Sequence, residues 1–208
     1  DVEGIDAASK AAIIAGLAFH SRVSVDDVYR EGISSITADD VAVAKTMNHV
    51  IKLLAIAELT SDDRISVRVH PTLIPRSHPL AAVRNAFNAV VVEAKSAGQL
   101  MFYGPGAGGA PTASAILGDV VAVARHRVSD SVGPRESDYA DRAIAPIGDT
   151  KTQFLIRLNV ADKPGVLAEI TKLFGDKKIS IDAMLQKESK EHESEADIVI
   201  LSHLAVEK

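Results

Sequence analysis

Cysteine is absent from the 208 residues, and aromatic residues make up only 4% of them. The lack of cysteine excludes disulfide bonds, a thiol nucleophile and a thiolate zinc site, and it fits a reducing compartment such as the cytoplasm. The chain also lacks a stretch rich in lysine and arginine, and its net charge is −5. This charge balance argues against a surface for nucleic acids or anionic membranes.

No segment of the sequence is typical of a membrane span, a signal peptide or a metal site. The longest apolar stretch near the start, AAIIAGLAF, is too short to cross a bilayer. Asp1 and Glu3 stand where a signal peptide would carry positive charges. The seven histidines form no i, i+4 pair and no HExxH pattern, so we expect no metal ion. We therefore expect a cytoplasmic protein without nucleic-acid or membrane partners.

The first distinctive stretch is DVEGIDAASKAAIIAGLAFH, which predicts a helix over 7–19. Asp6 and Lys10 are four residues apart, and on a helix they share one face with Ile13 and Leu17. The opposite face offers little polarity either: Ala8, Ser9, Ala12 and Gly16. A helix that is apolar almost all round is normally buried, so we expect this one to be buried too.

The pair of Asp6 and Lys10 has two interpretations. On a helix surface it would be an ordinary ion pair that contributes about 0.2–0.5 kcal/mol. In a buried helix each charge costs on the order of several kcal/mol to desolvate. A pair that is kept at that cost is a candidate for proton chemistry at the edge of a cleft. The expected burial of the helix favours the second interpretation.

The rest of the first half predicts short helices followed by strands. Ser24 and Thr37 each cap a predicted short helix, the first of which ends before Gly32. Period-two alternation and turn residues then predict four strands over 49–59, 64–75, 85–94 and 99–104. The turn sequence KSAG makes the last two a hairpin. These elements predict an α+β fold with a mixed or antiparallel sheet and helices on one face.

A cluster of glycines, YGPGAGGAPT, follows the hairpin and leads into a helix that ends near Arg127. Such glycines either let the backbone approach a ligand or form a tight turn, and the cluster alone does not decide between the two. Residues 129–150 are polar and contain proline and glycine, which predicts a linker. Residues 151–208 then predict a smaller βαββ unit, with the acidic stretch KEHESE as an exposed turn.

Three stretches in this order resemble the homoserine dehydrogenases: DVEGIDAASK, RVHPTLIPRSHPLAAVRNAFNAV and YGPGAGGAPTASAILGDVV. They identify 1–128 as the family's catalytic and dimerisation region. The remainder, with NVADKPGVLAEI, resembles an ACT module, a small domain of ferredoxin type that often binds amino-acid effectors. The family often has glycine where Asn85 stands, and asparagine is the residue that best replaces glycine at positive φ.

The resemblance implies that Lys10 and Asp6 are catalytic. The family interconverts L-homoserine and L-aspartate 4-semialdehyde with NAD or NADP, a step toward threonine and methionine. By motif position, Lys10 would exchange a proton with the substrate oxygen, and Asp6 would orient the substrate and tune Lys10. Asp1 and Glu3 would help bind the substrate's amino group.

Further residues acquire roles from the same resemblance. Gly106 and Gly108 would lie near the cofactor. Asp162, Gly165 and Val166 would bind an effector such as L-threonine, although a module used only for assembly is the alternative. The family also implies a homodimer or tetramer.

The family begins with a Rossmann domain, and we expect the strand–GxGxxG–helix unit of that domain to be absent from this sequence. We therefore expect a fragment, with an incomplete ACT module, that does not transfer hydride alone. The helix after Thr112 would pack on the absent domain, which predicts that Ile116, Val120 and Val121 are exposed. A non-catalytic module for dimerisation and effector binding remains the alternative. Fusion to an aspartate kinase is disfavoured, because such fusions are expected to carry their ACT sequence before the catalytic region.

Overall fold

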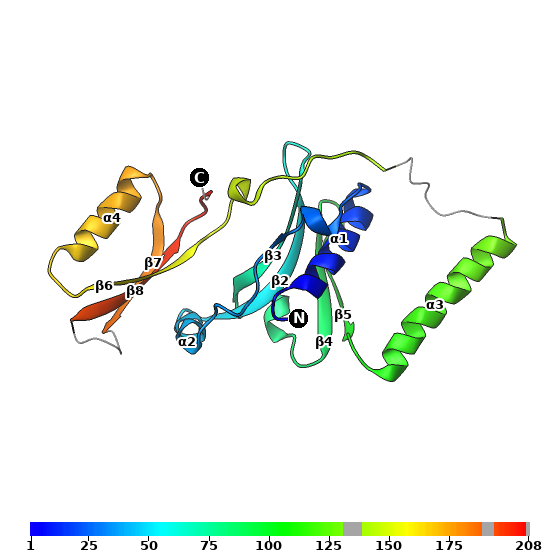
Figure 1. The fold of residues 1–208 in the computed structure, drawn as a ribbon, viewed down its shortest axis with the longest axis horizontal. Helices are drawn as coiled ribbons and strands as arrows, with labels where there is room; N and C mark the ends of the chain where they lie inside the picture. Colours follow the sequence, from blue (N-terminus) through cyan, green and yellow to red (C-terminus); the bar gives the residue numbers. More distant parts are fainter. Residues whose placement is uncertain (131–138, 189–193, 207–208) are drawn as a thin grey trace. The chain divides into compact units, whose positions relative to one another are not determined.

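The computed structural model describes residues 1–130, 139–188 and 194–206 (Figure 1). By its internal contacts the chain forms two compact units, Asp1–Ala143 and Ile144–Lys208. The expected acidic turn lies mostly outside the described residues. The expected linker boundaries stay a prediction.

The centre of the first unit is a mixed sheet of three strands in the order β1-β3-β2. β2 (His49–Leu59) and β3 (Ile65–Pro75) pair antiparallel from His49 opposite Pro75 to Leu59 opposite Ile65. Both strands were predicted from alternation and are confirmed. On β3 the predicted inward residues Ile65, Val67 and Val69 are all buried. The core of the unit therefore lies between this strand face and the helix that packs on it.

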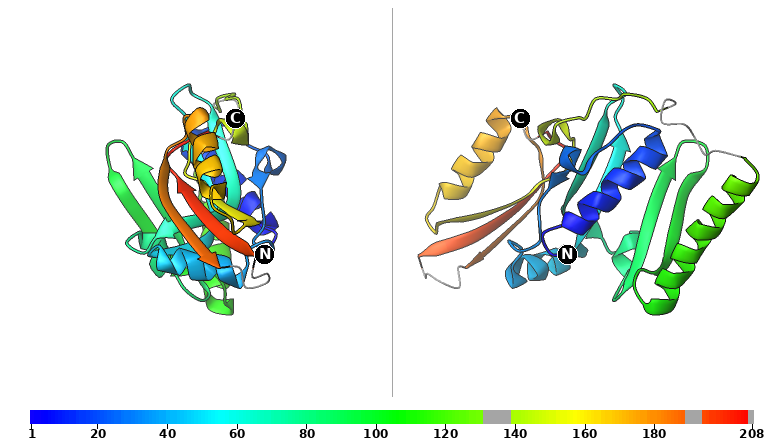
Figure 2. Two further views of the ribbon diagram at one scale, coloured as in Figure 1. Left: turned by 90° about the vertical axis from the view of Figure 1, so that its left-hand side faces the viewer. Right: turned by 45° about the vertical axis from the view of Figure 1, so that its right-hand side comes forward.

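That helix is α1 (Ile5–Phe19), which lies along β2 and β3 (Figure 2). The expectation that it is buried almost all round is wrong. Only its alanine side is buried, and that side consists of Ala8, Ala11, Ala12 and Ala15. The stripe of Asp6, Lys10, Ile13 and Leu17 is exposed, with Leu17 at 71%. Small methyl groups suffice to pack the helix on the sheet, and the described part of this chain leaves Ile13 and Leu17 largely uncovered.

The first predicted short helix is also wrong in length. Only a single 3-10 turn, η1 (Val25–Asp27), follows Ser24. The chain then becomes β1 (Tyr29–Arg30), which pairs parallel with Arg68 and Val69 of β3. Tertiary pairing with β3 thus prevails over the local helical pattern.

The second predicted short helix is confirmed as α2 (Ala38–Thr46). Its cap is Thr37, whose hydroxyl accepts a hydrogen bond from the backbone N–H of Asp40 at 3.2 Å. The Asp40 carboxylate in turn accepts one from the backbone N–H of Thr37 at 2.8 Å. This reciprocal pair is a capping box, which fixes where the helix begins.

The predicted hairpin consists of β4 (Phe87–Ala94) and β5 (Gly98–Pro105), and it follows a short turn, η2 (Pro79–Ala82). Asn85 adopts a φ of 57°, which confirms that asparagine takes the positive-φ place before β4. After the hairpin, α3 (Gly109–Val128) has no buried residue. The expected exposure of its apolar side chains is confirmed for Ile116, Val120 and Val121.

The second unit begins with a short turn, η4 (Ile147–Asp149), and has the predicted βαββ order. β6 (Leu155–Ala161) and β7 (Ile181–Glu188) flank β8 (Glu195–Ser202) in an antiparallel sheet, and α4 (Val166–Asp176) follows β6. β8 is the core of the unit, since nearly all of its side chains are buried. The predicted α+β fold class is confirmed in both units.

Candidate active site

The segment before α1 is fixed by a glycine. Gly4 is buried, has a φ of 72° and receives no side-chain cap. A Cβ at this position would lie 3.0 Å from Cγ1 of Val69, so the backbone approaches β3 closely here. Only glycine fits this conformation and this distance without strain. The turn at Gly4 therefore brings residues 1–3 beside the start of α1.

Glu3 is held in place by Arg30 of β1 and by Ser34 in the loop that follows β1. The guanidinium of Arg30 donates a hydrogen bond to the backbone oxygen of Glu3 at 2.8 Å. The hydroxyl of Ser34 donates a hydrogen bond to the Glu3 carboxylate. Nearby, the N–H of Ile33 donates to the oxygen of Val2 at 2.9 Å. The carboxylate thus has a defined position at the N-terminal end of α1.

One turn further along, the ammonium of Lys10 donates a hydrogen bond to the Asp6 carboxylate. The side chains are 58% and 59% exposed, respectively, so the expectation of a buried, desolvated pair is wrong for this chain. The pair is nevertheless formed as the i, i+4 spacing predicts. Together with Glu3 and Asp1, it gives the N-terminal end of α1 three carboxylates and one amine within a short segment. This set can bind a cationic group and exchange a proton with it.

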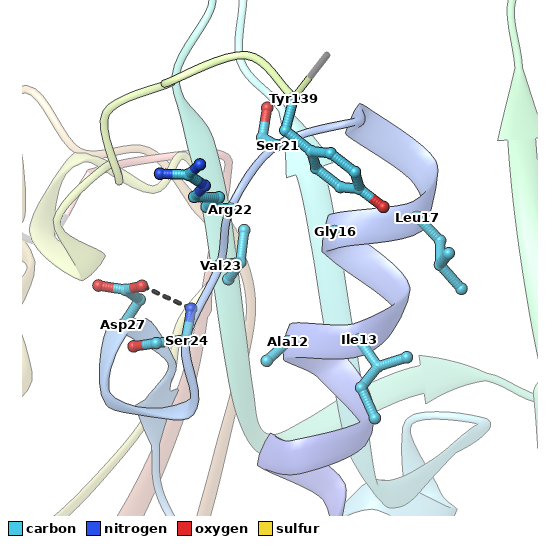
Figure 3. A pocket seen from close by; sticks show the side chains of 10 residues that line it. All are labelled: Ala12, Ile13, Gly16, Leu17, Ser21, Arg22, Val23, Ser24, Asp27 and Tyr139. Carbon is cyan, nitrogen blue, oxygen red and sulfur yellow. Dashed lines mark hydrogen bonds between the residues drawn. The ribbon is translucent and has the colours of Figure 1, made fainter. Parts of the chain in front are cut away.

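A hollow of about 630 Å³ runs along the second half of α1. Figure 3 shows Ile13 and Leu17 projecting from one side of the helix, while Tyr139 stands at one end of the hollow. At the other end, the Asp27 carboxylate accepts a hydrogen bond from the N–H of Ser24 at 2.7 Å (Figure 3). Neither Asp6 nor Lys10 lines this hollow. The exposed stripe of α1 therefore passes from the ion pair into an open, mixed apolar and polar surface.

Gly106 and Gly108 lie at the junction of β5 and α3. The N–H of Gly106 donates to the oxygen of Ala86 at 2.9 Å. A Cβ at position 106 would lie 1.8 Å from Nδ2 of Asn88, so the Asn88 side chain fills that space. Gly108 has a φ of 127° and stands directly before α3. In the described part of the chain, no hydrogen bond joins these glycines to Asp6 or Lys10.

The three residues expected to bind an effector do lie together. Asp162, Gly165 and Val166 line a hollow of about 340 Å³ in the second unit. Gly165 has a φ of 98° and precedes α4, so the hollow lies at the N-terminal end of that helix. Unpaired N–H groups at such an end favour an anionic group, and the Asp162 carboxylate favours a cationic one. An amino acid carries both charges.

Neither a metal centre nor a membrane span emerges from the described residues. Among them, no three histidine, aspartate or glutamate side chains gather where they could hold a metal ion. None of the helices described here has the length and apolar character needed to cross a bilayer.

Sequence reasoning missed the residues that hold Glu3. Arg30 and Ser34 lie 27 and 31 residues away from it, and no local pattern links them. The sequence predicted Gly32 only as the residue that follows a short helix. In the structure it lies against Glu3, because a Cβ at this position would be 2.8 Å from Cα of Glu3. The cluster YREGISS contains all three residues, and it is the signal that could have pointed to them.

Comparison with known proteins accounts for both units. Residues 1–121 match the family profile described as homoserine dehydrogenase, and residues 154–208 match the ACT domain. The homoserine dehydrogenase of Mycobacterium tuberculosis is 53% identical over all of this chain and 48% of its own length. That of Bacillus subtilis is 41% identical over 98% of this chain and 47% of its own length. The chain thus spans about half the length of the curated relatives it matches.

Solved structures agree with these relatives. The crystal structure of a homoserine dehydrogenase from Thiobacillus denitrificans superposes with a TM-score of 0.91 and 42% identity, over all of this chain and 48% of that one. The Staphylococcus aureus homoserine dehydrogenase at pH 7.5 gives a TM-score of 0.71 and 28% identity, over 99% of this chain and 49% of that one. Because the family profile matches more than half of the chain, and both of its units have the expected fold, the chain belongs to the homoserine dehydrogenase family.

Proposed function

We propose that the natural polypeptide containing this chain interconverts L-homoserine and L-aspartate 4-semialdehyde with NAD or NADP, in the cytoplasm. The observation that carries the proposal is the hydrogen-bonded pair of Asp6 and Lys10, which lies within the part that matches the family profile. The pair is accessible on the side of α1 that the described chain leaves uncovered. A substrate can therefore reach both groups.

Lys10 is the residue proposed to move the proton. During oxidation of homoserine, the hydroxyl proton passes to a neutral Lys10 Nζ while hydride leaves the carbon that bears the oxygen. In the reverse direction the Lys10 ammonium returns the proton to the aldehyde oxygen. Asp6 accepts a hydrogen bond from Lys10 and so directs its Nζ. Positioned acid–base help of this kind is typically worth about 10²–10⁴ in rate.

Asp1 and Glu3 are proposed to bind the substrate's ammonium group. Their support is position and charge, since both carboxylates lie in the segment that Gly4 turns toward α1. The hydrogen bonds from Arg30 and Ser34 restrain Glu3 before substrate arrives. Groups that are held in advance lose less freedom on binding, which favours a productive orientation.

A nicotinamide, when bound, supplies the hydride acceptor or donor, and this chain's proposed contribution to its site is small. Gly106 and Gly108 offer exposed backbone at the start of α3, which fits the edge of a nucleotide site. The spacing GxGxxG does occur at Gly104, Gly106 and Gly109, but it follows the antiparallel β4–β5 hairpin and not the first strand of a βαβ unit, so these residues fit a bordering role only. The choice between NAD and NADP depends on residues other than these.

The test is the Lys10→Ala substitution in the full-length natural polypeptide. Homoserine oxidation, followed by absorbance of the reduced nicotinamide, should lose at least about a hundredfold in kcat. Lys45→Ala, at the exposed end of α2, serves as the matched control and should leave kcat unchanged. Near-normal turnover of Lys10→Ala would remove the catalytic assignment.

We also propose that the hollow at Asp162, Gly165 and Val166 binds an amino-acid effector, with L-threonine as the first candidate. Its support is the pairing of a carboxylate with a helix N-terminus in a space of about 340 Å³. Titration calorimetry should show binding that Asp162→Asn weakens at least tenfold, because the ammonium group loses its charged partner. Absence of heat at millimolar L-threonine would count against effector binding.

A homodimer or tetramer is the proposed assembly. One face of the β4–β5 hairpin carries Val90 and Val92 opposite Phe102 and Leu100, and all four are exposed. A contiguous apolar patch of this kind marks an interaction surface. Sedimentation equilibrium should therefore show association that Phe102→Ser weakens, and a monomer at all concentrations would contradict the proposed assembly.

A further inference from the structure

Residues 139–143, which we call the return segment, run back onto the first unit. The N–H of Ala140 donates to the oxygen of His20 at 2.8 Å, and the Tyr139 ring stacks on His20 with centroids 4.4 Å apart. At its other end, the oxygen of Ala143 accepts from the N–H of Ile65 at 2.9 Å. The return segment therefore joins the C-terminal end of α1 to the start of β3.

Arg142 makes the most extensive side-chain contacts of the return segment. Its Nη1 donates to the backbone oxygen of Phe19 at 2.8 Å and to the hydroxyl of Ser21 at 3.0 Å. Its Nε donates to the Asp63 carboxylate in the β2–β3 turn at 2.9 Å. The side chain is only 24% exposed, and Ser21 is buried. A guanidinium presents its donors in a fixed plane, so this one residue holds two elements at a set spacing.

The C-terminal end of α1 is stabilised by a positively charged side chain from elsewhere in the chain. The carbonyl end of a helix carries partial negative charge, and a cation there is stabilising. α1 has no basic residue in its own last turn. Arg142 supplies the positive charge from a place 123 residues later in the sequence, directly on the Phe19 carbonyl.

Because α1 packs on the sheet through small side chains, the contacts at its two ends determine its position. The buried side of the helix consists of alanines alone. Methyl groups form low ridges, so they resist rotation or sliding of a helix on a sheet less than large interlocking side chains do. The helix is therefore fixed mainly where other contacts hold it. These are the close approach of Gly4 to Val69 at one end and, at the other, Arg142 on the Phe19 carbonyl beside the contacts of the return segment with His20.

We infer that Arg142 is a positioning residue that sets the place of Lys10 by holding the C-terminal end of α1. Lys10 moves with α1, whereas Glu3 is tied to Arg30 and Ser34. A small rotation of α1 therefore changes the distance from Lys10 Nζ to any substrate bound at Glu3. The inference rests on the proposed catalytic role of Lys10. Because the return segment continues directly into Ile144, the same contact joins α1 to the chain that enters the second unit.

The test is a double-mutant cycle in the full-length natural polypeptide. Arg142→Ala should lower kcat about tenfold, because misplacement of a catalytic group by a fraction of an ångström to 1 Å is costly. KM for L-homoserine should stay within twofold, since Glu3 keeps its own supports. In the Lys10→Ala background the same substitution should change the remaining rate by less than twofold. Arg142→Lys keeps the charge but not the planar donors and should give an intermediate kcat. Arg84→Ala, at an exposed turn, is the control.

Either of two kinetic results would overturn the inference: a kcat within twofold of the parent for Arg142→Ala, or an equal loss in the Lys10→Ala background. If Arg142→Ala does not fold, the cycle is run with Arg142→Lys and the same criteria apply. Hydrogen exchange gives an independent measurement, in which the amides of residues 17–21 should exchange at least tenfold faster in the Arg142 variants. Unchanged exchange also overturns it. Normal turnover of Lys10→Ala would instead reject the proposed function, while the exchange result still reports on α1.

Discussion

The hydroxyl of Ser34 donates a hydrogen bond to the carboxylate of Glu3, and so joins the loop after β1 to the segment before α1. This bond restrains one of the two carboxylates proposed to bind the substrate's ammonium group. A hydrogen bond to a charged group contributes about 1.5–3 kcal/mol.

Ser34→Ala should therefore raise KM for L-homoserine about tenfold and leave kcat nearly unchanged, because the lost interaction acts on binding alone. Steady-state kinetics of the full-length natural polypeptide provides the measurement. Ser35→Ala, which changes the neighbouring exposed hydroxyl, is the matched control. An equal fall in kcat would show that Glu3 acts in the chemical step instead.

Gly32 should tolerate no side chain. A Cβ there would lie 2.7 Å from Oε2 of Glu3 and 2.8 Å from the oxygen of Val2. Gly32→Ala must push Glu3 away from this position, so KM should rise and the free energy of unfolding should fall by about 1–3 kcal/mol. Gly175→Ala in α4 has open space around it and should be neutral or slightly stabilising. Urea unfolding of both variants measures the difference, and equal stabilities would contradict the expected clash.

Asn85 should be replaceable by glycine but not by alanine. Its φ of 57° lies in the left-handed region, which costs most residues roughly 1–2 kcal/mol. We expect Asn85→Ala to destabilise the protein by about 1 kcal/mol, and Asn85→Gly to have a smaller effect. Thermal unfolding of the two variants side by side would reveal the order. Equal losses of stability in both variants would mean that contacts of the asparagine side chain stabilise the protein, and not its tolerance of a positive φ.

The β2–β3 turn should respond to acid. A hydrogen bond from the Thr60 hydroxyl at 2.5 Å, and then the Arg64 guanidinium at 2.7 Å, hold the pKa of Asp62 below its ordinary value of 3.8. A lowered pKa in the folded state means that the ionised carboxylate stabilises the fold. This contribution is fully present above pH 3.8 and is lost as the pH falls through the folded-state pKa.

Thr60→Val should accordingly raise the pKa of Asp62 toward 3.8, because it removes the larger of the two causes. An NMR titration of the Asp62 carboxyl carbon measures the change directly. Asp62→Asn should flatten the dependence of stability on pH in the same range. A titration midpoint unmoved by Thr60→Val would assign the lowered pKa to Arg64 alone.

Strictly periodic elements could be predicted from the sequence. Apolar and polar residues alternate in β3 from Ile65 to His70, β2 is a β-rich run between turn residues, and the KSAG turn sets the hairpin, so local information suffices. The helix predicted after Ser24 failed because Tyr29 and Arg30 pair with β3, which follows much later in the chain. The predicted burial of α1 is wrong for a different reason. An apolar helix surface indicates that something covers it, but not that the same stretch of chain does.

The candidate site, too, could be predicted from the sequence only in part. The spacing of Asp6 and Lys10 places them on one helix face, and the structure has them hydrogen-bonded. The partners that hold the ends of this site, Arg30, Ser34 and Arg142, act across 27 to 123 residues. Such contacts depend on tertiary packing, for which a single sequence contains no local pattern. Their residue types are also common, so composition does not single them out.

The strand order of the second unit has a consequence for how it is made. β6 and β7 do not pair with each other, because β8 lies between them and follows both in sequence. On the ribosome, the two outer strands emerge before the one that unites them. They stay unpaired with β8 until Ile198 and Ile200 are synthesised and close the core, so this sheet can form only after β8 has been translated.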